Sequence, residues 1–186
     1  VQASVTSSTH ERKSKSYVLT KHGLIYIKHN SLHEDIPIVI VFRALGIQSD
    51  KEILQLVAGQ DEAYAELFAV NIEKAAKLEV FSRRQALDYI GARGKVMRRG
   101  VGLRRSASDE ALEVLATVIM AHVPVENGNF RNKTMYIATM VRRVLVCMLD
   151  ESKVDDRDYV GNKRLELAGQ LLALLVEDLF KKFTFD

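Results

Sequence analysis

An acidic stretch that turns basic holds the densest set of chemically active side chains in the sequence. Asp155, Asp156 and Asp158 lie within four residues, and Lys163 and Arg164 follow a Gly-Asn pair. Clustered carboxylates can bind Mg²⁺ beside phosphate groups, so a magnesium site is one interpretation. The neighbouring cations allow two others: an ion-pair network that begins the last helix, or contact with a nucleic-acid strand.

A second stretch is purely basic. Residues 91–105 carry six Lys or Arg and no Asp or Glu, with glycines between them. The stretch 91–107 has neither a helical nor a strand period, which predicts a mobile basic loop. This loop is either solvated without a ligand or in contact with phosphate groups. Its possible phosphate contacts are Arg93, Lys95, Arg98, Arg99, Arg104 and Arg105.

Other kinds of site find little support in the sequence. The five histidines do not recur at metal-ligand spacing, and we expect them at the surface, His29 and His33 included. Cys147 lies in an apolar run and is expected to be a small buried hydrophobe. No nucleophile elbow or phosphate-binding Gly-Lys-Thr loop occurs. No apolar run approaches the roughly 18 residues of a membrane span, so no membrane partner is expected.

Composition predicts a folded domain. The chain has 186 residues, of which 47% are hydrophobic and 27% charged, and this balance is typical of globular proteins. It begins without a methionine, and we expect it to be a domain of a larger protein. We expect a single domain over residues 1–186, with a β-rich edge at 1–32, the loop at 91–107 and a helical half at 108–186.

The predicted fold class is α+β: a mostly helical lobe with a small antiparallel β-hairpin or sheet near the N-terminus. Two apolar strands flank the connection 20–23, whose glycine suits a tight turn. Pro37 begins an apolar helix that Gly46 ends. Helices are also expected after Ser49 and Ser82, which begin capping-box patterns.

Further helices follow from the 3.6-residue period of apolar side chains. We expect two short helices at Asp61–Leu67 and Asn71–Leu78, and one that Ser108 caps. A longer helix is expected from about Phe130. The last helix, from Leu165 onward, has apolar residues on most sides and is predicted to be largely buried.

Several blocks resemble the second-largest subunit of eukaryotic multisubunit RNA polymerases, in its lobe or domain 2. They are long, specific and in the same order as in that family. Finer features resemble the RNA polymerase III version, among them the stretches at 4–14 and 123–125. The blocks that carry the resemblance are Glu34–Ile47, Gln85–Gly91 and Asp155–Phe183.

The resemblance implies a role without catalysis in this chain. No cofactor is expected here, because the catalytic magnesium of the family is held by the largest subunit. The lobe lines the downstream DNA cleft, so the resemblance makes DNA a partner and places the protein in the nucleus. In position, Asp158 and Lys163 correspond to residues that face a DNA strand, with Arg157 and Arg164 beside them. Lysine at 163 suits a point-charge phosphate contact.

The resemblance also implies protein partners. These are other polymerase subunits, including the largest, and a heterodimer related to an initiation factor. The leading hypothesis is therefore a DNA-facing structural domain of RNA polymerase III, which acts on small RNA genes. One alternative is the lobe of another multisubunit RNA polymerase acting only as a protein-docking platform. Another is an independent magnesium-dependent nucleotidyltransferase or nuclease that uses Asp155, Asp156 and Asp158.

Overall fold

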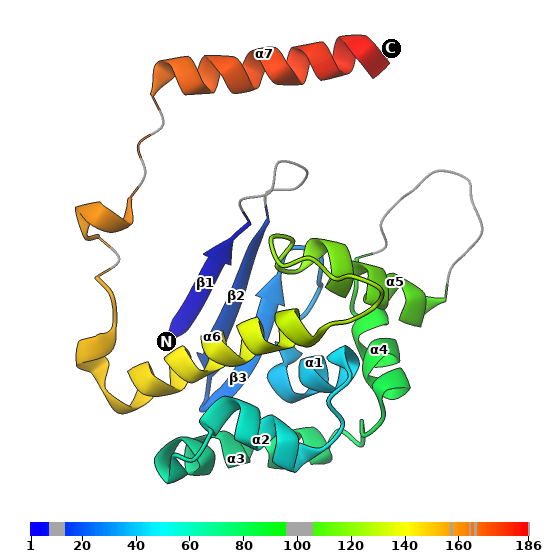
Figure 1. Cartoon of the computed structure of the whole chain (residues 1–186), viewed down its shortest axis with the longest axis vertical. Coiled ribbons are helices and arrows are strands. Elements are labelled where there is room, and N and C mark those ends of the chain that lie inside the picture. The colour runs from blue at the N-terminus through cyan, green and yellow to red at the C-terminus, as the bar shows by residue number, and fades with distance from the viewer. Residues whose placement is uncertain (8–13, 96–105, 157, 164, 166, 186) are drawn as a thin grey trace. The chain divides into compact units, whose positions relative to one another are not determined.

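The chain folds into two compact units. A computed structural model describes all residues except 8–13, 96–105, 157, 164, 166 and 186 (Figure 1). The N-terminal unit is Val1–Ser152 and the C-terminal unit is Lys153–Asp186. The division into regions expected from the sequence stays a prediction.

The N-terminal unit begins with an antiparallel sheet whose strands are neighbours in chain order. The strands are β1 (Gln2–Thr6), β2 (Lys15–Lys21), β3 (Leu24–His29) and β4 (Ile36–Pro37). The β2–β3 turn places both His22 and Gly23 at positive φ, 51° and 77°. Such a two-residue turn matches the natural twist of a hairpin, and the predicted hairpin is confirmed.

Helices make up most of the remaining described chain. In the N-terminal unit they are α1 (Ile38–Leu45), α2 (Asp50–Ala58), α3 (Glu62–Ala76), α4 (Arg83–Gly91), α5 (Ala107–Glu113), the π-helix η1 (Val114–Val118) and α6 (Arg131–Leu149). The C-terminal unit contains the 3₁₀ turn η3 (Val160–Asn162) and α7 (Ala168–Phe185), and the turn η2 (Glu151–Lys153) spans the boundary. The α+β class expected from the sequence is confirmed.

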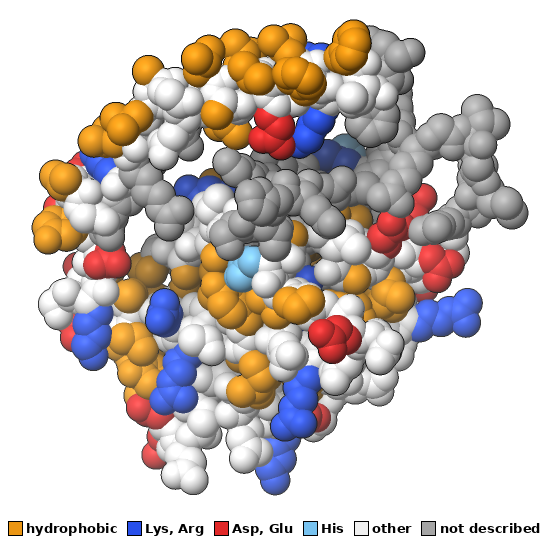
Figure 2. All heavy atoms as spheres, turned by 45° about the horizontal axis from the view of Figure 1, so that its top comes forward, with side chains coloured by type: hydrophobic (Ala, Val, Ile, Leu, Met, Phe, Trp, Pro, Cys, Tyr) orange, Lys and Arg blue, Asp and Glu red, His pale blue; other side chains and the backbone are white. Residues whose placement is uncertain are grey.

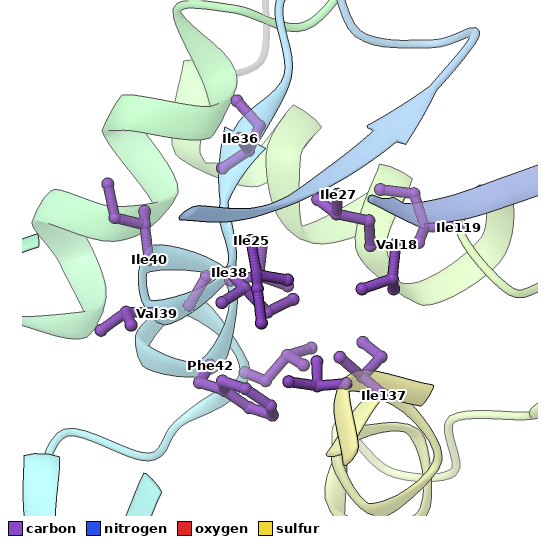
Figure 3. Packing of buried hydrophobic residues seen from close by; sticks show 14 of the residues in the cluster. Val18, Ile25, Ile27, Ile36, Ile38, Val39, Ile40, Phe42, Ile119 and Ile137 are labelled. Atoms are coloured by element: carbon purple, nitrogen blue, oxygen red, sulfur yellow. The ribbon is translucent and has the colours of Figure 1, made fainter. Parts of the chain in front are cut away.

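The core of the N-terminal unit lies between the sheet and helices α1 and α6. Every residue of α1 is buried, as its continuous apolar sequence predicts. In Figure 3, Val18 and Ile25 of the sheet point toward Phe42 of α1 and Ile137 of α6. Helix α6 contacts β1 and β2, whereas α1 contacts β3 and β4. The two helices therefore cover adjacent parts of one sheet.

Arg43 fixes the elements around α1. Its side chain is almost fully buried, and its Nη2 donates to Asp50 Oδ1 at 2.5 Å. Its Nη1 donates to the carbonyl of Val80, which lies just before α4. These two charge-assisted hydrogen bonds hold α2 and the approach to α4 onto α1, whereas the buried Nε of Arg43 has no hydrogen-bond partner among the described residues.

Two helix boundaries differ from the sequence-based expectation. The two short helices expected between residues 61 and 78 are one continuous helix, α3, which begins at the Asp61 cap. Asn71 did not break it, because its Oδ1 accepts from the Ile25 amide at 2.6 Å and ties α3 to β3. The cap of α5 is Ser106 and not Ser108, whose hydroxyl donates to Asp88 instead.

The C-terminal unit leaves the apolar side chains of its helix exposed to solvent. The prediction that its last helix is largely buried is wrong for this chain, because apolar side chains along α7 are exposed (Figure 2). Phe183 is 80% exposed and Phe180 65%. Among its described residues the unit has α7 and short turns but no second layer that could cover the apolar face.

Candidate nucleic-acid interface

The stretch in which Asp155, Asp156 and Asp158 are followed by Lys163 is a solvent-exposed turn in the C-terminal unit, and we call it the acidic-to-basic corner. Asp155, Asp156 and Asp158 are all exposed. The Asp158 amide donates to Asp156 Oδ1 at 2.9 Å, and the Tyr159 amide donates to the Asp156 carbonyl at 3.2 Å. The turn η3 follows and presents Lys163 to solvent. The corner is thus shaped by its own backbone and is accessible to a partner.

The two residues predicted to face a strand lie together. Lys163 Nζ is 3.2 Å from Asp158 Oδ1, and their side chains are 56% and 85% exposed. An ion pair this exposed is weak and exchanges readily, so a phosphate group can compete with Asp158 for the ammonium. The flanking Arg157 and Arg164 lie outside the described residues. The strand-facing roles stay a prediction.

The three aspartates do not form a metal site in the structure. Among the described residues, no group of three or more His, Cys, Asp or Glu side chains is arranged to hold a metal ion. Asp156 Oδ1 accepts the backbone amide of Asp158, which is the bond pattern of a turn. Asp156 thus has a structural use in the turn, and the magnesium interpretation stays an untested alternative.

The start of the basic loop is fixed to the N-terminal unit. Arg93 stacks 3.7 Å above the Tyr89 ring, and its Nε donates to Glu34 Oε2 at 3.0 Å. Lys95 is exposed, although its amide donates to the Ser31 carbonyl at 2.8 Å. Of the two described cations, Lys95 is thus the one whose side chain can reach a phosphate. The other predicted contacts lie outside the described residues: Arg98, Arg99, Arg104 and Arg105.

Both ends of this loop meet at one point. A Cβ placed on Gly91 would overlap the Ala107 backbone, so glycine permits α4 and α5 to touch. Ser108 donates to the Asp88 carboxylate across the same junction. On the other side, Leu32 and Gly94 form an isolated antiparallel bridge. The described residues on both sides of 96–105 are therefore fixed by contacts around α4.

Sequence reasoning missed a buried lysine. Lys133 is fully buried in α6, and its Nζ donates to the carbonyls of Leu115, Ala116 and Ile119 at 2.7 to 2.9 Å. These carbonyls belong to η1 and the residue after it, where the helical bonding pattern is irregular. Burial lowers the pKa of Lys133 to about 8. The available signal was its position four residues before Ile137, on the buried stripe of the helix.

Among the described histidines, His22 and His33 are exposed as expected whereas His29 and His122 are not, and His10 lies outside the described residues. His29 is buried, not at the surface, because its Nδ1 accepts from the Ser31 amide at 3.0 Å and this closes the end of β3. His122 is half-buried with its ring edge-on to Tyr136, at 5.0 Å between centroids. Burial, with a smaller contribution from the Lys133 charge, lowers the pKa of His122. Cys147 is half-buried rather than buried.

Comparisons with known proteins converge on one family. The family described as RNA polymerase Rpb2, domain 2, matches residues 1–166. The chain is 63% identical over 185 residues to DNA-directed RNA polymerase III subunit RPC2 of Schizosaccharomyces pombe. Identity to the subunits of that name is 59% in Saccharomyces cerevisiae and 50% in Drosophila melanogaster, over 186 residues each. Each alignment covers 100% of this chain but only 16% of the relative.

Proposed function

The chain belongs to the RNA polymerase Rpb2 domain 2 family, and from this premise we propose that it is a non-catalytic, DNA-facing domain of the second-largest subunit of RNA polymerase III. In that role it lines the downstream DNA cleft in the nucleus and docks other subunits. The magnesium that serves catalysis is held by the largest subunit, and no catalytic step uses residues of this chain.

The observation that carries the DNA-facing role is the exposed corner around Lys163. Its ammonium lies on a turn whose backbone is fixed by its own hydrogen bonds, and its partner Asp158 is 85% exposed. A cation held in this way is accessible to a phosphate group with little reorganisation of the chain. Lys95, whose backbone amide is bonded to the Ser31 carbonyl while its side chain is exposed, is a second accessible cation.

Salt dependence tests this role. We expect the chain to bind a short DNA duplex or bubble weakly, with an affinity that falls as salt is raised. In fluorescence anisotropy, Lys163→Gln should reduce the slope of log affinity against log salt by about 1. Lys77→Gln is the matched control, because Lys77 is also an exposed lysine paired with one exposed carboxylate, Glu73 of α3, and lies away from the proposed contact. An affinity independent of salt would contradict the role.

A second candidate function is a protein-docking platform with negligible DNA affinity. Two of the described cations that were predicted to contact DNA already form ion pairs within the chain. Arg93 pairs with Glu34, and Lys163 pairs with Asp158. Exposed apolar side chains on α7 also point to protein contacts, and in the parent subunit we expect polypeptide outside this chain to cover them. Normal co-purification with polymerase III subunits, combined with no measurable DNA binding, would favour this candidate.

A further inference from the structure

Helix α6 has an exposed face that the proposed DNA contacts do not use. It runs across β1 and β2 (Figure 1) and buries Ile137, Val141 and Val144 toward the core. The opposite side of the same helix has exposed residues from Arg131 to Arg143 and again at Leu149. We call this side the α6 stripe, and its members are Arg131, Met135, Thr139, Arg142, Arg143 and Leu149.

The α6 stripe carries positive charges that no acidic residue of the same helix neutralises. No Asp or Glu occurs in the 19 residues of α6, whereas α2, α3 and α5 of the same unit each contain several. Within the described part of the chain, Arg131, Arg142 and Arg143 make no ion pair. Three exposed guanidiniums on one helix therefore present unneutralised positive charge, which is complementary to an anionic partner.

One of these arginines is held in place. The Arg142 guanidinium lies 5.5 Å from the centroid of the Tyr64 ring, which projects from α3. Stacking restricts the long side chain while it leaves the N–H edge available for a carboxylate. Ordering an arginine before a partner arrives reduces the entropy lost on binding. Arg142 is therefore suited to be the centre of a contact.

The stripe is also partly apolar. Met135 is 50% exposed and Leu149 is 52% exposed, and they lie seven residues on either side of Arg142. This spacing places all three on one line along the helix. Arginine and methionine are enriched at protein interfaces, whereas lysine, glutamate and aspartate are depleted there, and the stripe contains none of the depleted types.

These features select among possible occupants. A second copy of the chain would bring the same arginines together, so charge repulsion opposes it. A nucleic-acid backbone would pair with the arginines but leave Met135 and Leu149 uncovered. A helix of this length is roughly 28 Å long and about 10 Å wide, which is less than half the area of a standard interface and suits a short segment.

We propose that the α6 stripe docks a short acidic, amphipathic segment of a partner protein, with its carboxylates on the three arginines and its apolar side chains on Met135 and Leu149. This inference rests on the proposed function as a domain of a multisubunit polymerase. It names the surface and the chemistry of one partner segment. Recognition of this kind follows the mode in which an amphipathic element lies along a groove or helix face.

Site-specific photo-crosslinking in the complete polymerase tests the inference. A benzophenone amino acid replaces Thr139 at the centre of the stripe, and Val70, 51% exposed on α3, carries it as the control. We expect residue 139, and not residue 70, to crosslink to a partner segment that mass spectrometry shows to be rich in Asp or Glu with interspersed apolar residues. Crosslinks only to nucleic acid, only to residues 168–185 of the same chain, or to nothing would overturn the proposal.

Charge reversal separates the stripe from a general effect of positive charge. Arg142→Glu should reduce the crosslink at least about tenfold, because Arg side chains commonly dominate interface energy. Met135→Ser should also reduce it, whereas Arg84→Glu, an exposed change on α4, should not. Reversing an acidic residue of the partner segment to Arg should restore crosslinking to Arg142→Glu. Loss in none of the stripe variants would overturn the proposal.

The two proposals can fail separately. Assembly of the unsubstituted chain into polymerase, and the salt dependence of its DNA binding, report on the proposed function alone. If both are normal while the stripe crosslinks to no acidic segment, the inference is wrong and the proposed function stands. If the chain never assembles with polymerase subunits, the proposed function fails first.

Discussion

In the N-terminal unit apolar side chains lie between a sheet and helices, whereas in the C-terminal unit they lie on the outside of one helix. Phe42 is fully buried in the first and Phe183 is 80% exposed in the second. Polar groups differ in the same way. Lys133 is buried with three carbonyl partners, whereas Lys163 has one exposed carboxylate partner.

The contrast shows where the stability of the chain resides. Buried area and satisfied internal polar groups contribute most to folding free energy, and both are concentrated in the N-terminal unit. The family match ends at residue 166, and α7 begins at Ala168. The family match thus includes the whole N-terminal unit and the turns that begin the C-terminal unit, but not α7. The exposed apolar side chains of the C-terminal unit contribute little to folding and are available for contacts with other polypeptides.

Matched phenylalanine substitutions should give the largest difference between the units. We expect Phe42→Ala to lower the free energy of unfolding by about 3–5 kcal/mol, because it creates a cavity in the core. Phe183→Ala should change it by less than about 0.5 kcal/mol, since the ring is already in solvent. Urea unfolding followed by circular dichroism measures both. Equal losses would mean that α7 contributes to the folded core.

Matched lysine substitutions test the polar side of the contrast. Lys133→Met should cost about 2–4 kcal/mol, because three buried carbonyls lose their donor. Lys163→Met should stay within about 0.5 kcal/mol, as an exposed ion pair contributes little. The same urea titrations report both values. A neutral Lys133→Met would show that η1 satisfies its carbonyls in another way.

The two units should also respond to pH with opposite sign. Burial lowers the pKa of Lys133 from 10.5 to about 8, so between these values the unfolded chain holds a proton that the folded chain has released. The free energy of unfolding should therefore rise as pH increases through this window. The hydrogen bond with Glu177 raises the pKa of Lys181 on α7, so its small contribution should be lost at high pH. Unfolding midpoints of the wild type and Lys133→Met, compared from about pH 7.5 to about pH 10, isolate the Lys133 effect.

Helix caps should give the smallest difference. Ser82 and Gln85 form a complete capping box at α4, with both reciprocal hydrogen bonds. At α7 only the Gln170 half is described, where its Oε1 accepts from the Leu167 amide at 3.2 Å. We expect Ser82→Ala to cost about 1 kcal/mol in unfolding free energy. Gln170→Ala should leave that free energy nearly unchanged and lower only the helicity of α7, measured by circular dichroism.

Local signals in the sequence were sufficient for much of the fold. The hairpin, the buried helix α1 and the capping box at Ser82 follow from turn residues and apolar period alone, and all three are present. The continuity of α3 did not follow, because Asn71 is stabilised by the amide of Ile25, 46 residues away. A bond over that separation leaves no local pattern to read.

The charged turn around Lys163 was predictable from the sequence, whereas the long-range ion pairs of the candidate contacts were not, and the role of the turn stays a prediction. Residue types indicated a charged turn near Lys163, and the turn is exposed. The partners of Arg93 were not readable, because Glu34 is 59 residues distant in the chain. The exposure of α7 was missed for a different reason. An apolar helix is predicted to be buried, but the sequence pattern does not say which polypeptide covers it.

The contact between Gly91 and Ala107 holds the end of α4 directly against the start of α5, so the packing of these two helices does not depend on the length of the chain between them. Closing a longer excursion at an already formed junction costs only about 0.6 kcal/mol for each doubling of its length. An affinity epitope or a fluorescent reporter inserted there should leave the surrounding helices intact. The junction thus offers a place to attach a handle for purifying or tracking the whole assembly.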